Sequence, residues 1–109
     1  MITAEQINLL KDVIVQTMQP EKVYLFGSYA HGVPNEDSDL DILIEVENTD
    51  LPKVERNLEV RSEMNKHKLL HFPKDIFIYT SKEINEWKHL KNSFISLALF
   101  NSKKLYERN

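Results

Sequence analysis

The sequence contains no cysteine and only two glycines among its 109 residues. Without cysteine there are no disulfides and no thiolate chemistry, which suits a reducing compartment, so we expect a cytoplasmic location. No stretch approaches the roughly 20 consecutive apolar residues of a membrane helix. The N-terminus also lacks the positively charged region and apolar run of a signal peptide. We therefore expect no association with a membrane.

An excess of basic residues is also absent. Fourteen Lys and Arg stand against 17 Asp and Glu, for a net charge of −3. Direct nucleic-acid binding is not expected, because neutralising phosphates over a whole surface requires clustered Lys and Arg. The composition is 41% hydrophobic and 28% charged, as in ordinary globular proteins. The length predicts one domain over residues 1–109.

The hydrophobic pattern predicts alternating helices and strands. Thr3 and Gln6 form a capping-box pattern, and helical spacing predicts an amphipathic helix over 4–18 that ends before Pro20. Apolar runs predict strands at 23–26 and 75–79. Residues 39–46 alternate: Leu40, Ile42, Ile44 and Val46 share one face, and Asp39, Asp41, Leu43 and Glu45 share the other.

Three further helices are predicted around these strands. One starts near Asp50 and ends by Pro73, with Val54, Leu58, Arg61 and Asn65 on one side. Another has Ser81 as its N-cap and runs through Trp87 and Leu90, and a third covers 94–100. This order predicts a two-layer α+β or α/β domain whose sheet is covered mainly on one face by helices.

The two glycines flank a short polar segment. Gly27 and Gly32 enclose Ser28, just after the strand at 23–26. Glycine serves where φ is positive or where something approaches the backbone closely, so the turn either presents N–H groups to an anion or simply needs glycine for its geometry. A Walker-type phosphate loop is excluded, because Val33-Pro34 stands where Lys-Ser/Thr is required.

Three aspartates strengthen the first interpretation. Asp39 and Asp41 lie at i and i+2 of one strand, so their side chains leave the same face, where they repel each other and are costly to desolvate. A divalent cation would resolve this conflict. The alternative is a solvated edge strand, which Leu43 on the same face argues against. Asp75 begins another strand, and three carboxylates from two neighbouring strands can hold two metals, with Asp75 as the candidate general base.

These residues carry a family resemblance. Phe26-Gly-Ser-Tyr-Ala-His-Gly32, followed after five positions by Ser38-Asp-Leu-Asp41, resembles the signature of the DNA-polymerase-β-like nucleotidyltransferases. Ten residues separate Ser28 from Asp39, as is usual in that superfamily. The resemblance implies an α+β nucleotidyltransferase fold with a mixed sheet.

The resemblance also implies the roles of these residues. Gly27 and Ser28 would hold triphosphate oxygens of ATP, and Asp39, Asp41 and Asp75 would form the catalytic triad and bind Mg²⁺, with two ions expected. Relatives often carry arginine where this chain has His31, and a protonated histidine meets phosphate without bidentate contacts.

The C-terminal segment, Ser93-Phe-Ile-Ser-Leu-Ala-Leu through Lys104-Leu-Tyr-Glu107, is similar to the tail of the minimal nucleotidyltransferases. That resemblance implies a HEPN-domain partner: a toxin that the enzyme, as antitoxin, silences by transferring AMP to a tyrosine or another hydroxyl. Two alternatives remain. One is transfer to a small molecule such as an antibiotic, and the other is an antitoxin that neutralises its partner by binding alone.

Two features lie outside this assignment. The segment 94–100 is apolar nearly all round, as in a core helix or a partner-binding one. Basic residues gather in the preceding part of the chain, where they form a solvated face or reach a phosphate-bearing partner: Arg61, Lys66, Lys68 and Lys74.

Overall fold

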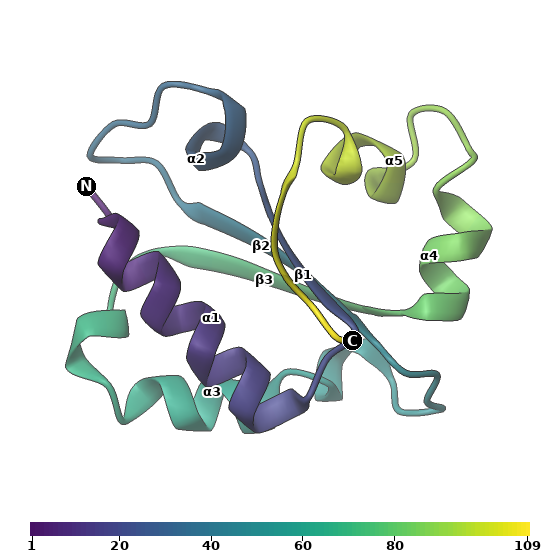
Figure 1. Cartoon of the computed structure of the whole chain (residues 1–109), viewed down its shortest axis with the longest axis horizontal. Helices are drawn as coiled ribbons and strands as arrows, with labels where there is room; N and C mark the ends of the chain where they lie inside the picture. Colours follow the sequence, from purple (N-terminus) through teal and green to yellow (C-terminus); the bar gives the residue numbers. More distant parts are fainter.

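A computed structural model describes all residues from 1 to 109. Its elements, in chain order, are α1 (Ala4–Met18), β1 (Lys22–Phe26), α2 (Ser28–His31), β2 (Leu40–Val46), the 3₁₀ turn η1 (Lys53–Glu55), α3 (Leu58–Asn65), the 3₁₀ turn η2 (Lys68–Leu70), β3 (Lys74–Thr80), α4 (Ser81–Trp87), α5 (Phe94–Leu99) and β4 (Lys103–Glu107). The four strands form one sheet in the order β3-β2-β1-β4. The β1–β2 and β1–β4 pairs are antiparallel and the β2–β3 pair is parallel, so the sheet is mixed (Figure 1).

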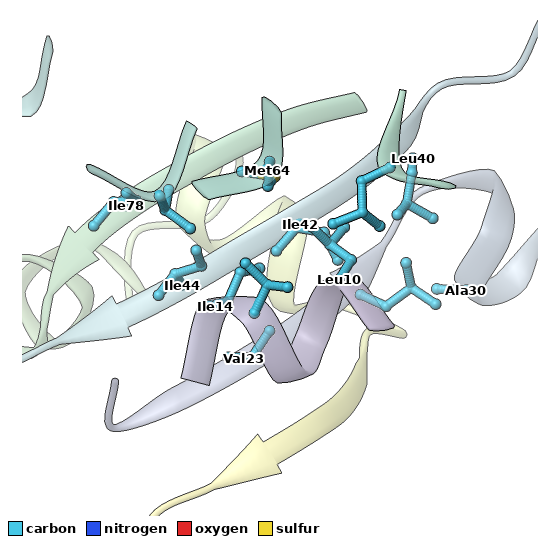
Figure 2. Close-up of a cluster of buried hydrophobic side chains, with 13 residues drawn as sticks. Leu10, Ile14, Val23, Ala30, Leu40, Ile42, Ile44, Met64 and Ile78 are labelled. Atoms are coloured by element: carbon cyan, nitrogen blue, oxygen red, sulfur yellow. The ribbon is translucent and has the colours of Figure 1, made fainter. Parts of the chain in front are cut away.

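The first helix forms as its sequence predicts. The Thr3 hydroxyl accepts from the Gln6 backbone N–H, and the Gln6 side chain accepts from the Thr3 N–H, which completes the predicted capping box. The helix closes at Gln19 in a left-handed conformation, one residue before Pro20. Its buried residues Leu10 and Ile14 face the sheet (Figure 2).

The larger core lies on this face of the sheet. It contains 13 buried residues, and β2 contributes Leu40, Ile42 and Ile44, as the alternation predicted (Figure 2). Helix α3 connects the parallel strands β2 and β3 and packs beside α1. Its buried residues Val60 and Met64 complete the same core.

A smaller core covers part of the other face. Leu43 of β2 packs there with Ile84 of α4 and with Ile95 and Ala98 of α5. Figure 1 shows α4 and α5 across the sheet from α1 and α3. The predicted α+β fold with a mixed sheet is confirmed, with the larger core under α1 and α3.

Three local predictions were wrong. The helix expected from residue 50 begins only at Leu58, because Pro52 starts the separate turn η1. Val54 and Leu58 are 81% and 62% exposed, and the helix buries Val60 and Met64 in their place. The N-cap of α4 is Thr80, since its hydroxyl accepts from the Glu83 N–H in a capping box.

Strand β4 was not predicted at all. It is short and polar, with Lys103, Lys104 and Glu107 exposed, so it lacks the apolar run that marked the other strands. Its pairing with β1 alone places it at the sheet edge. Nowhere in the chain is a helix long and apolar enough to cross a membrane.

Candidate active site

The turn after β1 has the geometry that its glycine predicted. Gly27 adopts φ 75° and ψ −157°, a conformation that L side chains rarely adopt. Its carbonyl accepts from the N–H groups of Ala30 and His31, which starts the short helix α2. The half-buried Ser28 hydroxyl makes no hydrogen bond within the protein. The turn therefore holds a polar group available to a ligand.

Close packing joins this turn to the carboxylates. A Cβ placed on Gly27 would lie 2.3 Å from Oδ2 of Asp41. Phe26, the last residue of β1, is the registered partner of Asp41 on β2. A glycine is therefore required at position 27 for two reasons. The backbone has a positive φ there, and the Asp41 carboxylate occupies the space that a side chain at position 27 would fill.

Asp41 and Asp75 are neighbours on adjacent strands of the sheet. They are registered partners on the parallel strands β2 and β3, on the side that also carries Leu43 and Phe77. Neighbouring strands lie roughly 4.8 Å apart, so the two carboxylates sit side by side. The predicted meeting of acids from two strands is therefore found.

The charges of these acids are not balanced by any cation of the chain. None of Asp39, Asp41 and Asp75 forms a salt bridge. Burial raises the pKa of Asp41, and the neighbouring charges of Asp75 and Asp39 raise it further. Asp41 is half-buried, whereas Asp39 and Asp75 are exposed.

Asp39 stands just before β2, at the end of an ordered loop. The Asn35 N–H donates to the Ser38 hydroxyl at 2.9 Å, and the Asp37 N–H donates to the Asn35 side chain at 2.8 Å. Asp39 lies close enough to Asp41 for its charge to raise the pKa of that carboxyl.

The donor chemistry of these residues suits a hard divalent cation. Three carboxylates supply the oxygen ligands that Mg²⁺ prefers, and the raised pKa of Asp41 marks charge that a cation would offset. No group of three or more His, Cys, Asp or Glu side chains lies close enough together in the structure to hold a metal ion by itself. Mg²⁺ is commonly bound by one or two carboxylates together with substrate phosphates, and Asp41 and Asp75 are the two carboxylates that the sheet brings together.

Aromatic side chains continue the carboxylate face toward α5. Phe77 lies two residues after Asp75, and its ring centroid is 4.8 Å from that of Phe94 and 5.9 Å from that of Phe26. Tyr79 extends the group at 6.0 Å from Phe94, with the Lys53 ammonium 4.6 Å from its centroid. The sequence pattern does not reveal this cluster, because Phe94 joins it only through tertiary packing.

His31 lies beside this arrangement, whereas His67 and His71 flank the 3₁₀ turn η2. His31 is exposed at the end of α2, next to the Gly27–Ser28 turn. His67 and His71 do not share a helix face, because α3 ends at Asn65 and the two residues flank the 3₁₀ turn η2.

Comparisons with known proteins agree with this arrangement. The family model described as polymerase beta, nucleotidyltransferase, matches residues 8–109. The chain belongs to the polymerase-β nucleotidyltransferase family. No curated protein shows significant similarity to it.

A solved structure shows the same fold. This polymerase-β-type nucleotidyltransferase chain is similar to the crystal structure of a candidate nucleotidyltransferase from Sulfolobus solfataricus, with a TM-score of 0.63 and 19% identity. The match covers 95% of this chain and 79% of the other. At this identity the likeness concerns the fold, while membership of the family supports nucleotidyl transfer as the general activity.

Proposed function

We propose that this nucleotidyltransferase domain transfers AMP from ATP, with Mg²⁺, to a hydroxyl of a protein partner, and that it is an antitoxin of the minimal nucleotidyltransferase type acting on a tyrosine of a HEPN-domain toxin. One observation carries the catalytic part of this proposal. The carboxylates of Asp41 and Asp75 lie side by side, without a counter-cation, and Asp41 packs against the Gly27 turn.

In the proposed step, the acceptor oxygen forms a bond to the α-phosphorus of ATP. The bond from that phosphorus to the oxygen bridging to the β-phosphate breaks, and pyrophosphate leaves with this bonding pair. Asp75 takes the proton of the acceptor hydroxyl, because it is exposed at the strand start and reachable by an incoming group. The Ser28 hydroxyl and the N–H groups of the turn bind phosphate oxygens.

Asp39, Asp41 and Asp75 are the residues that would hold Mg²⁺. When bound, the cation neutralises phosphate charge and lowers the pKa of a coordinated hydroxyl. Asp41, the most buried of the three, fixes the position of the ligand set relative to the Gly27 turn.

The surface beside the site favours a protein as acceptor. Phe94 of α5 belongs to the aromatic cluster on the carboxylate face. In the same segment, the exposed fraction is 40% for Phe94, 60% for Leu97 and 71% for Phe100. An apolar surface next to a site fits a macromolecular partner better than a small polar antibiotic.

The proposal is tested by measuring whether labelled phosphorus is transferred from ATP to a protein. The purified chain is incubated with a lysate of its source cells, Mg²⁺ and ATP labelled at either the α- or the γ-phosphorus. We expect a labelled protein band with the α-label and none with the γ-label, and mass spectrometry should find AMP on a tyrosine of a HEPN-domain protein. A γ-labelled band that depends on the chain would contradict nucleotidyl transfer, because it would mean phosphoryl transfer.

Variants separate catalysis from binding alone. Asp75→Asn should abolish labelling while the chain remains folded, and Lys88→Gln, at an exposed lysine on α4's end, should label like the wild type. An Asp75→Asn protein that still silences the toxin in cells would show that neutralisation occurs by contact. Labelling of an isolated aminoglycoside with no protein acceptor would favour the small-molecule alternative.

A further inference from the structure

A hollow of about 390 Å³ lies at the start of β3, on the side of the sheet opposite Asp75. Residues of helix α3 and of the chain entering β3 line it, and Figure 1 shows where these two segments lie in the fold. Its lining residues are Arg61, Met64, Asn65, Phe72, Pro73, Lys74 and Ile76. The volume falls within the usual range of small-ligand sites.

Two cations share this hollow with no carboxylate between them. Arg61 makes no ion pair and no side-chain hydrogen bond. The half-buried Lys74 ammonium donates to the carbonyls of Leu70 and Phe72, and neither acceptor carries a charge. An ammonium has three donors, so two of them are used by these carbonyls. The Lys74 ammonium also lies 4.7 Å from the centroid of the Phe72 ring, a contact that carries no negative charge.

The other two arginines of the chain, Arg56 and Arg108, both form ion pairs. Arg56 is bound to Glu83 at 2.6 Å, and Arg108 is bound to Glu21 and Glu47 at 3.2 and 3.0 Å. Against this background, Arg61 and Lys74 stand out as an unbalanced pair.

We propose that this hollow is a second ligand site, which binds a phosphate group between Arg61 and Lys74. A guanidinium fork and an ammonium point charge together are the donors that proteins use for phosphate. The Asn65 side chain adds an uncharged donor, and the apolar Met64, Phe72 and Ile76 offer a surface for an organic group. The phosphate comes either from an inorganic ion such as pyrophosphate or from a nucleotide.

The site differs from the catalytic one in face and in residues. Lys74 and Asp75 are consecutive on β3, so their side chains point to opposite faces of the sheet. Occupation of the hollow would hold the start of the strand that carries Asp75. The proposal stands independently of the reaction proposed above, because it rests on the hollow and its cations alone.

The test is a titration without divalent cations, followed by amide chemical shifts and calorimetry. The probes are pyrophosphate, inorganic phosphate, AMP and adenosine. We expect phosphate-bearing probes to shift amides of residues 61–65, 72 and 74–76, and adenosine to shift none. AMP binding about 10-fold tighter than phosphate would assign the site to a nucleotide, and equal or weaker AMP binding would assign it to an inorganic ion.

Four variants decide the location. Arg61→Gln and Lys74→Gln should each weaken binding about 10-fold or more, since a hydrogen bond to a charged group is worth that much. Lys88→Gln, which removes an exposed charge elsewhere, should leave binding unchanged. Ser28→Ala, in the catalytic turn, should leave the amide shifts of residues 61–65, 72 and 74–76 unchanged, because these report on the hollow alone. The Arg61 side chain makes no hydrogen bond or ion pair, so its variant should fold even if Lys74→Gln does not.

Three outcomes would overturn the proposal. Binding unaffected by Arg61→Gln, or weakened equally by Lys88→Gln, would overturn the proposal in favour of diffuse electrostatic attraction. Binding lost in Ser28→Ala and kept in Arg61→Gln would overturn it by placing the phosphate at the catalytic turn.

Discussion

Asp41 and Asp75 lie opposite each other in register on the parallel strands β2 and β3, so that two like charges face one another on one side of the sheet. The antiparallel neighbour β1 ends at this point, and its last residue pairs with Asp41. A mixed sheet thereby brings the end of one strand and the starts of two others to a single edge. The Gly27–Ser28 turn and the carboxylates are joined by this topology.

Replacing Gly27 by alanine should damage both parts of the site. The positive φ and the 2.3 Å approach to Asp41 Oδ2 leave no room for a Cβ. We expect a loss of about 1–3 kcal/mol in the free energy of unfolding, measured by denaturant titration. The double variant Gly27→Ala/Asp41→Ala should lose less than the sum of the two single variants, because truncating Asp41 removes the clash. Strict additivity would show that the contact does not matter.

The positions of Gly27 and the aspartates follow more directly from the sequence than the surrounding helices do. Gly27, Asp39 and Asp41 form a pattern of fixed spacing, and the alternation of β2 places Asp41 on the face of Leu43, whereas Asp75 joins it only through the pairing of β3 with β2. In contrast, Val54 and Leu58 are apolar yet exposed, and β4 is polar yet paired, because tertiary contacts decide both. The hollow between Arg61 and Lys74 depends on how α3 crosses to β3, which no local pattern encodes.

The stability of the protein should depend on pH through Asp41. Its pKa is raised above the ordinary value of 3.8, so its protonated form is favoured by folding. The stabilising contribution is present below about pH 4 and is lost as the pH rises through the higher folded pKa. Asp41→Asn should therefore raise the melting temperature at pH 7, and this gain should shrink as the pH falls below 4. A gain of equal size at pH 3 and pH 7 would contradict the assignment.

Binding of Mg²⁺ should stabilise the wild type more than it stabilises Asp41→Asn. Mg²⁺ without nucleotide should raise the melting temperature of the wild type, because an ion that binds only the folded state stabilises it, by about 2.7 kcal/mol at 100 times its dissociation constant. Asp41→Asn should show no such rise, since it lacks the central carboxylate. Equal stabilisation of both proteins in differential scanning fluorimetry would place the ion elsewhere.

Ser28→Ala should separate ligand binding from folding. The hydroxyl has no partner within the protein, so stability should change by less than about 0.5 kcal/mol. Binding of ATP with Mg²⁺ should weaken about 10-fold or more, which calorimetry measures, because a hydrogen bond to a charged oxygen is lost. Ser62→Ala, at an exposed serine of α3, is the matched control and should bind like the wild type.

The ion pair between Arg56 and Glu83 should be the main electrostatic support of α4. The Arg56 side chain is 7% exposed, and its guanidinium meets both carboxylate oxygens, at 2.6 and 3.2 Å, while also donating to the Ile78 carbonyl. Glu83 in turn accepts from the Thr80 N–H in the capping box. Arg56→Ala should lower the free energy of unfolding by about 2–4 kcal/mol, because it leaves a partly buried carboxylate without its partner.

The pH dependence of that loss has the opposite sign to that of Asp41. The hydrogen bond from Arg56 lowers the pKa of Glu83 below its ordinary 4.5, so the contribution is present above about pH 4.5 and is lost as the pH falls through the folded pKa. The difference between Arg56→Ala and wild type should accordingly be largest near neutral pH and shrink in acid. Lys66→Ala, which breaks the exposed pair with Glu63, should cost less than about 0.5 kcal/mol. Comparable losses in the two variants would mean that burial does not strengthen the Arg56 pair.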